Sequence, residues 1–174
     1  TSGGGLTRFK PRRFECFGPE AGITEPVVNS LSPGASGEVW IATYGKGLFR
    51  LKDGRASFEE LLDLTGYSTV YMQSVARDRT GRTWVGTDGN GLCILGTQTR
   101  QWVPYAVSSG RNILALFEDS RGRMWMSGGE GVACCDAGAW RRYGPAEGVP
   151  AVGFHAIAED SNGAIWIADE KRVL

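Results

Sequence analysis

The feature that most constrains the fold of this chain is an internal repeat of about 42 residues. Four tryptophans mark the repeat at intervals of 44, 41 and 41 residues: Trp40, Trp84, Trp125 and Trp166. A glycine lies three residues before each of them: Gly37, Gly81, Gly122 and Gly163. An aspartate lies six residues before the last three, at Asp78, Asp119 and Asp160, whereas the first copy has Gly34 there. A chain with this regularity folds as a series of similar units.

Each copy contains four short segments with the composition of β-strands. In the second copy they are residues 71–78, 82–87, 91–96 and 100–105, rich in β-branched and aromatic residues and separated by turn residues. The D-x-x-G stretch after the first segment predicts a turn in which the aspartate accepts backbone N–H groups and the glycine takes a positive φ. Four strands in about 42 residues are typical of a β-propeller blade. We therefore predict an all-β fold of four-stranded antiparallel blades, with the tryptophans packed between them.

The repeat landmarks divide the chain into three complete blades and two partial ones. We expect a single propeller segment over residues 1–174, with complete blades at about 26–64, 69–106 and 111–144 and partial blades at 1–25 and 150–174. Two explanations account for the partial blades. The chain is a fragment of a larger propeller, or its two ends pair and close a four-bladed ring. We favour the fragment, because a chain that stops in mid-strand would leave an unprotected sheet edge.

The repeat resembles that of the two-component regulator propeller family. GEVWIATYGKGLFRL (37–51) and GRTWVGTDGNGLCIL (81–95) carry the resemblance best, and it covers essentially the whole chain. The third and fourth copies depart from it at SGGEGVACCD (127–136) and DEKRVL (169–174). The resemblance implies a periplasmic, extracytoplasmic sensor propeller of bacteria, with a histidine kinase region elsewhere in the full-length protein. It implies as partners a small-molecule or oligosaccharide ligand, the remaining blades, and downstream receptor domains.

Composition excludes several other classes of partner. Lysines plus arginines number 19 and acidic residues number 19, so a formal net charge of zero offers no long-range attraction for nucleic acid. No run of 18 apolar residues occurs, and we expect no membrane insertion by this segment. The four cysteines lack zinc-binding spacing and are expected to pack as small hydrophobic residues in strands: Cys16, Cys93, Cys134 and Cys135. We expect no metal and no cofactor.

Two motifs suggest catalysis, and each has a structural interpretation that we prefer. Glu118–Asp119 and Glu159–Asp160 resemble general acid–base pairs, but adjacent strand residues point to opposite faces of a sheet. Because each pair precedes a turn at the same repeat position, we interpret its aspartate as a turn cap. The glycine-rich GGEG (128–131) lacks the Lys-Ser/Thr and the helix of a phosphate-binding loop. We therefore expect no catalytic residues in this segment.

The loops that join the second and third strands, and the loops that enter each blade, are the expected ligand-binding face. Loops carry function while strands carry packing, and polar groups near aromatic rings suit a sugar. His155, the only histidine, occupies the axis-lining position held by Asn29, Gln73 and Leu114 in the other copies. It could bind a ligand there, although a lone histidine is more often a structural residue. The candidate ligand-binding residues are Tyr44, Lys46, Tyr67, Asp88, Asn90, Arg111, Asn112, Glu130 and His155.

Three functions compete for this fold. The first is a non-catalytic sensor module in which a ligand shifts a conformational equilibrium in a larger receptor. The second is a protein-interaction platform, and the third is an enzyme resembling the streptogramin lyases, which are propellers with similar repeats. We favour the sensor, because of the family resemblance and because the sequence lacks a catalytic constellation.

Overall fold

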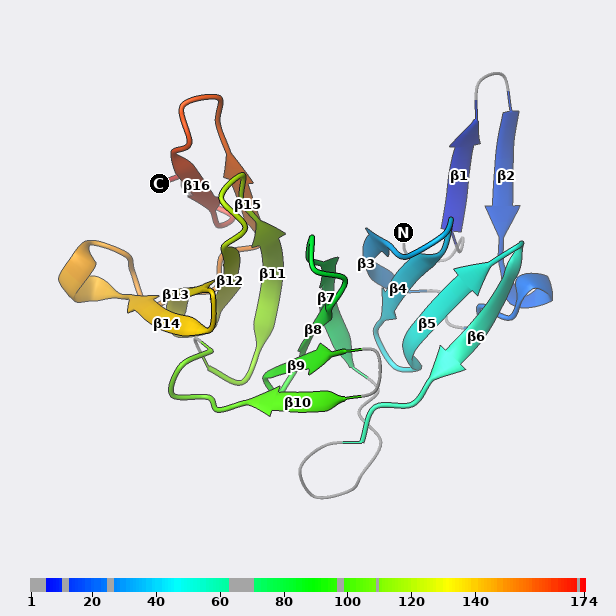
Figure 1. Ribbon diagram of the computed structural model, residues 1–174, viewed down its shortest axis with the longest axis horizontal. Helices are drawn as coiled ribbons and strands as arrows, with labels where there is room; N and C mark the ends of the chain where they lie inside the picture. The colour runs from blue at the N-terminus through cyan, green and yellow to red at the C-terminus, as the bar shows by residue number, and fades with distance from the viewer. Residues whose placement is uncertain are drawn as a thin grey trace. The chain divides into compact units, whose positions relative to one another are not determined.

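The computed structural model describes residues 6–10, 13–24, 27–62, 71–96, 99–108, 110–171 and 173–174. Within these ranges the chain forms three four-stranded antiparallel sheets and two two-stranded sheets (Figure 1). The predicted fold class of three complete and two partial β-propeller blades is therefore confirmed. The chain divides into two compact units, Thr1–Met72 and Gln73–Leu174. The assignment of residues 1–174 to one propeller segment stays a prediction.

The first unit contains a two-stranded sheet, a short 3₁₀ helix and one complete blade. Strands β1 (Leu6–Lys10) and β2 (Arg13–Phe17) form an antiparallel hairpin, and the 3₁₀ helix η1 (Pro19–Ala21) follows. The complete blade is a meander with the order β3 (Val28–Pro33), β4 (Val39–Thr43), β5 (Gly47–Lys52) and β6 (Arg55–Glu59). Phe17, Ala21 and Ile23 pack against Ile41, Phe49 and Leu51 of the blade.

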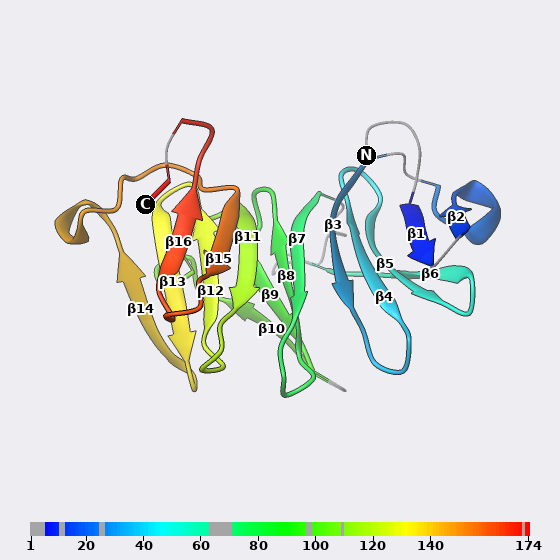
Figure 2. The ribbon, with the colours of Figure 1, turned by 90° about the horizontal axis from the view of Figure 1, so that it is seen from above.

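The second unit contains two complete blades and a two-stranded sheet in chain order (Figure 2). One blade consists of β7 (Met72–Arg77), β8 (Thr83–Thr87), β9 (Leu92–Leu95) and β10 (Arg100–Val103). The next consists of β11 (Ile113–Glu118), β12 (Met124–Gly128), β13 (Gly131–Asp136) and β14 (Ala139–Tyr143). The 3₁₀ helix η2 (Pro145–Glu147) precedes the last sheet, which contains β15 (Ala156–Glu159) and β16 (Ile165–Ala168).

The hydrophobic core of the second unit lies between its sheets. Trp84 of β8 packs with Met124, Met126 and Ala133 of the following blade. Trp125 of β12 packs in a separate cluster with Ile167 of β16 and with Phe154, which precedes β15. Successive strand residues enter different clusters because their side chains point to opposite faces of the sheet. A lone sheet has no partner for either face, so the blades are stable as a stack.

The first strand of a blade carries a bulge at a repeated position. The pairing of β3 with β4 shifts register between Val28 and Ser30, and that of β11 with β12 shifts between Ile113 and Ala115. Asn29 and Leu114 lie at these shifts. They occupy the repeat position that His155 holds in the last sheet. A bulge changes the direction of the extra residue's side chain, so the side chain at this position does not follow the regular alternation between the two faces of the sheet.

Candidate functional site

The D-x-x-G turn between the first two strands of a blade is organised around a buried aspartate. Oδ1 of Asp78 accepts the backbone N–H groups of Thr80 and Arg82 at 3.0 and 2.9 Å. Its Oδ2 accepts Nε of Arg82 and Nε1 of Trp84, both at 2.8 Å. Burial raises the pKa of Asp78, but the hydrogen bonds from Thr80, Trp84 and Arg82 outweigh it and hold the pKa at about 2. The carboxylate is thus an ionised turn cap at neutral pH.

The same turn recurs in the following two copies. Oδ2 of Asp119 accepts Nε of Arg123 at 2.6 Å and Nε1 of Trp125 at 2.8 Å. Oδ2 of Asp160 accepts Nε1 of Trp166 at 3.0 Å. The three glycines that close these turns have φ values of +91°, +81° and +81°: Gly81, Gly122 and Gly163. The aspartates predicted as turn caps therefore hold the repeat tryptophans as well as the turns.

The glutamate of each acidic pair has a different partner, in the turn of the preceding blade. Glu118 accepts the backbone N–H of Arg79 at 3.1 Å and its Nε at 3.2 Å. Glu159 accepts the backbone N–H of Ser120 at 2.7 Å and its hydroxyl at 2.7 Å. We call this contact the interblade clamp. Because one acid of each pair caps its own turn and the other clamps the preceding turn, the pairs are scaffold.

On the opposite end of the second unit, the loop between β8 and β9 is bound to the segment that enters the next blade. Gly89 N–H donates to Oδ1 of Asn112 at 2.8 Å, and Gly91 N–H donates to the carbonyl oxygen of Arg111 at 2.6 Å. The loop itself is closed by Thr87, whose hydroxyl donates to the carbonyl oxygen of Gly91 at 2.9 Å. These two loops lie at the same end of the sheets, because successive connections between antiparallel strands lie at alternate ends.

Two further contacts order side chains on this loop-rich end. The guanidinium carbon of Arg111 lies 4.8 Å from the ring centroid of Tyr105. Glu130 pairs with Arg142 at 3.1 Å, and Arg142 also donates to the carbonyl oxygen of Ala106 at 3.2 Å. Tyr105 and Arg142 were missed from the sequence. Both residues lie outside the loops that we expected to bind a ligand. The folded chain places Tyr105 against Arg111 and Arg142 against Glu130.

In the first unit, two exposed tyrosines form an aromatic pair. The rings of Tyr44 and Tyr71 are 4.9 Å apart at an interplanar angle of 51°, and the side chains are 43% and 46% exposed. Their backbones form an isolated antiparallel bridge, and Tyr44 N–H also donates to the carbonyl oxygen of Val27 at 3.0 Å. The bridge therefore holds the two residues side by side, and both stay partly exposed. Tyr71 was not among the predicted ligand-binding residues, although an aromatic residue at the start of a first strand was a visible signal.

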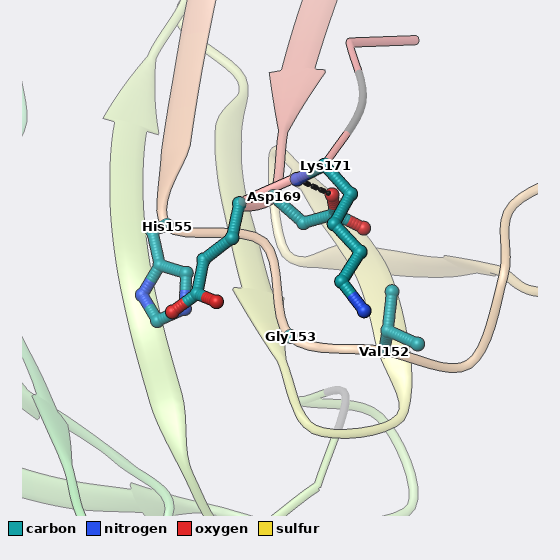
Figure 3. Close-up of a pocket in the computed structure, with 6 residues that line it drawn as sticks. Val152, Gly153, His155, Asp169 and Lys171 are labelled. Atoms are coloured by element: carbon teal, nitrogen blue, oxygen red, sulfur yellow. Dashed lines mark hydrogen bonds between the residues drawn. The ribbon is translucent and has the colours of Figure 1, made fainter.

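A pocket of about 200 Å³ surrounds the histidine of the last sheet (Figure 3). Its lining residues are Val152, Gly153, His155, Asp169, Glu170 and Lys171. Oδ1 of Asp169 accepts the backbone N–H of Lys171 at 2.7 Å, which orders the loop after β16. His155 is exposed, and within the described part of the chain its side chain makes no hydrogen bond or ion pair.

The predicted ligand-binding residues fall into two groups. Asn112 and Glu130 already hold a loop amide and an arginine, so their polar atoms are partly committed to the scaffold. The side chains of Lys46, Asp88 and His155 make no hydrogen bond or ion pair with other described residues, and the Arg111 guanidinium lies against the Tyr105 ring. Asn90 lies in the β8–β9 loop, where its N–H donates to the hydroxyl of Thr87 at 3.1 Å. Tyr67 lies outside the described residues.

The cysteines do not form a site. Cys93, Cys134 and Cys135 are buried free thiols, and Cys16 is an exposed one. Cys134 and Cys135 enter different hydrophobic clusters, on the two faces of their strand. Burial raises the pKa of Cys93 and of Cys134 to about 11. Among the residues that the structure describes, no group of three or more His, Cys, Asp or Glu is placed to hold a metal ion.

Part of the third copy carries a recognisable family signature. Residues 108–130, from the end of the β10–β11 loop through β12, match the family model described as two component regulator propeller. The matched stretch contains Asp119, Arg123 and Trp125, which form the capped turn of the third copy. Comparison with curated proteins gave no match.

Solved structures similar to the chain share the propeller fold. One is described as the extracellular domain of a hybrid two component system from B. thetaiotaomicron, with 23% identity and a TM-score of 0.69. The match covers 82% of this chain and 20% of that one. A virginiamycin B lyase from Staphylococcus aureus has 18% identity and a TM-score of 0.60, over 80% of this chain and 48% of that one. The chain thus spans about a fifth of the extracellular domain and shares its fold.

No helix among the described residues is long and apolar enough to cross a membrane.

Proposed function

We propose that this chain is a non-catalytic, ligand-sensing part of a bacterial extracytoplasmic receptor, and that its ligand is an oligosaccharide. The regulator propeller repeat at residues 108–130 and the likeness to extracellular domains of B. thetaiotaomicron systems support the receptor context. In this proposal the segment lies in the periplasm, and the other receptor domains of the same protein receive the signal.

The exposed aromatic pair of Tyr44 and Tyr71 carries the proposal of a sugar ligand. A pyranose ring has a flat apolar face that stacks on an aromatic ring, while its hydroxyl groups need hydrogen-bond partners at the rim. The two rings contact each other, and this restricts both side chains before a ligand binds, so binding would cost less side-chain entropy than with two isolated rings. Lys46, exposed two residues after Tyr44, is the nearest candidate along the chain for a hydroxyl or carboxylate of the sugar.

A sensor must also distinguish two states of its receptor. A ligand with equal affinity for both states transmits nothing, however tightly it binds. The loop-rich end of the second unit offers the remaining uncommitted polar side chains, Asp88 and Arg111. We propose that these side chains contact the next receptor domain, so that the balance between states is read at this end of the second unit.

The proposal is tested by isothermal titration of the chain with a panel of oligosaccharides. Binding of at least one of them is expected, and Tyr44→Ala and Tyr71→Ala should each weaken it by about tenfold, equivalent to about 1.4 kcal/mol. Phe58→Ala removes another exposed aromatic side chain of the same unit and is the matched control. Absence of heat with every sugar, or equal loss in all three variants, would overturn the sugar assignment.

One observation favours a lyase-like enzyme as the second candidate. His155 lines a pocket together with the carboxylates Asp169 and Glu170, and a lyase is among the structures of similar fold. A base beside carboxylates is the minimum for proton abstraction. If turnover of virginiamycin B is measurable and is lost in His155→Ala, the enzyme replaces the sensor as the better assignment.

A further inference from the structure

A buried backbone carbonyl group recurs where the chain enters the first strand of a copy. The residues that carry it lie 12 positions before the repeat tryptophan in the last three copies, and all are 0% exposed: Met72, Ile113 and Phe154. A buried carbonyl oxygen needs a hydrogen-bond donor. In each of these copies the carbonyl oxygen accepts a hydrogen bond from a side chain of the preceding copy.

The donors lie at three different repeat positions. They are Nδ2 of Asn29 for Met72, at 2.8 Å, Oγ of Ser74 for Ile113, at 2.9 Å, and Oγ of Ser127 for Phe154. The three copies therefore share the acceptor and not the donor. We call this bond the entry latch, because it holds the segment through which the chain enters a copy.

Two of the latches exclude each other sterically. Gly86 occupies in its copy the position that Ser127 has in the next, and a Cβ on Gly86 would lie 2.2 Å from Oγ of Ser74 and 2.6 Å from the carbonyl oxygen of Ile113. In the copy of Ser127, the position of Ser74 is held by Ala115, which has no hydroxyl. The two hydroxyls are thus alternative ways of reaching the same carbonyl group.

In the first unit the entry latch lies beside the aromatic pair. Tyr71 immediately precedes Met72, whose carbonyl oxygen accepts the side-chain amide of Asn29. Two residues before Asn29, the carbonyl oxygen of Val27 accepts the backbone N–H of Tyr44 at 3.0 Å. Val27 therefore holds the backbone of one tyrosine, and Asn29 holds the backbone next to the other.

Asn29 differs from the other two donors in its surroundings. It is exposed and lies at the bulge of β3, whereas Ser74 and Ser127 are buried. Its replacement therefore opens no cavity in the core. Leu114 occupies the equivalent position two copies later, so the fold accommodates an apolar side chain there. A variant at this position can thus lose the latch and keep the sheet.

We propose that Asn29 is a positioning residue of the aromatic sugar site. Its bond to Met72 holds the backbone at Tyr71, so that the ring of Tyr71 meets the ring of Tyr44 before a ligand arrives. A pair that is assembled in advance saves the cost of ordering side chains on binding. The sugar part of this inference rests on the proposed function, whereas the dependence of the ring contact on Asn29 does not.

Titration with an oligosaccharide that binds the chain tests the positioning role. Asn29→Ala and Asn29→Leu should each weaken binding by about threefold to tenfold, because Tyr71 must then be ordered by the ligand. Ser74→Ala removes an entry latch from the second unit and is the matched control, with unchanged affinity. In a Tyr71→Ala background, Asn29→Ala should cause no further loss, because Asn29 acts through Tyr71. Additive losses in the double variant would overturn the proposal.

The ring contact is measured separately, without a ligand. Nuclear Overhauser effects between the ring protons of Tyr44 and Tyr71 should weaken in Asn29→Ala and Asn29→Leu and persist in Ser74→Ala. Unchanged ring contacts in folded variants of Asn29 would also overturn the proposal. If the contacts weaken as expected but no oligosaccharide binds the unsubstituted chain, the sugar assignment fails by itself and Asn29 keeps its role in positioning Tyr71.

Discussion

Nε1 of Trp84 donates a hydrogen bond to Oδ2 of Asp78, six residues earlier, at 2.8 Å. The bond joins the two most regular features of the repeat, the turn before the second strand and the indole that packs between sheets. Trp125 with Asp119 and Trp166 with Asp160 repeat it at 2.8 and 3.0 Å. The last three copies of the repeat therefore each fix their tryptophan through their own turn.

Removal of the turn aspartate should strongly destabilise the second unit. Asp78→Ala leaves the buried indole N–H of Trp84 and two turn amides without an acceptor, and we expect a loss of about 3 kcal/mol in the free energy of unfolding. Urea denaturation followed by tryptophan fluorescence measures it. Asp88→Ala, in a loop on the opposite end, is the matched control and should change stability by less than about 0.5 kcal/mol. Equal effects of the two substitutions would contradict the role of the cap.

The same carboxylate makes stability depend on pH at the acidic end. The pKa of Asp78 is about 2 in the folded chain and 3.8 ordinarily, so its contribution is complete above about pH 4. That contribution, about 2 kcal/mol, is lost as the pH falls through the folded-state value. Asp119, whose pKa is also lowered, adds a loss of the same sign. The urea concentration at the unfolding midpoint, measured between pH 6 and pH 2.5, should decrease once the pH is below about 4. The decrease should be less steep in the Asp78→Asn variant.

A glycine in β8 should tolerate no side chain. A Cβ on Gly86 would lie 2.2 Å from Oγ of Ser74 and 2.6 Å from the carbonyl oxygen of Ile113 in the next blade. Because a backbone atom cannot move aside, Gly86→Ala should destabilise the chain by about 1–3 kcal/mol. Gly129→Ala, where nothing lies within 4 Å, serves as the control in the same thermal unfolding experiment. A neutral Gly86→Ala would show that the two blades are less closely packed than described.

One of the four thiols should react in the native chain. Cys16 is exposed, whereas Cys93, Cys134 and Cys135 are buried. The raised pKa of Cys93 and Cys134, about 11, further lowers their thiolate fraction. Titration with Ellman's reagent at pH 8 should therefore show one fast equivalent, rising to four in denaturant. Cys16→Ser should abolish the fast phase, and a fast phase that persists in this variant would place another thiol at the surface.

The tryptophan, aspartate and glycine of the repeat could be interpreted from sequence because their contacts are local. Asp78 and Trp84 lie on two sides of one tight turn, so the chemistry of the turn residues is sufficient to bring them together. The period of the repeat and the alternation of strand residues similarly predicted the four-stranded sheets. They also predicted that Cys93, Cys134 and Cys135 pack as small hydrophobic residues, whereas the same expectation was wrong for Cys16, which is exposed.

Tertiary structure decided the contacts between residues far apart in the chain. Glu118 and Arg79 are 39 residues apart, and nothing in the Glu-Asp dipeptide indicates that its first acid binds the preceding blade. The pairing of the Tyr44 and Tyr71 rings likewise depends on the tertiary fold. The sequence by itself determined the unit of structure, because turns and strands are encoded within a few residues. Only the folded chain determined which polar side chains stay uncommitted, because that depends on how neighbouring blades stack.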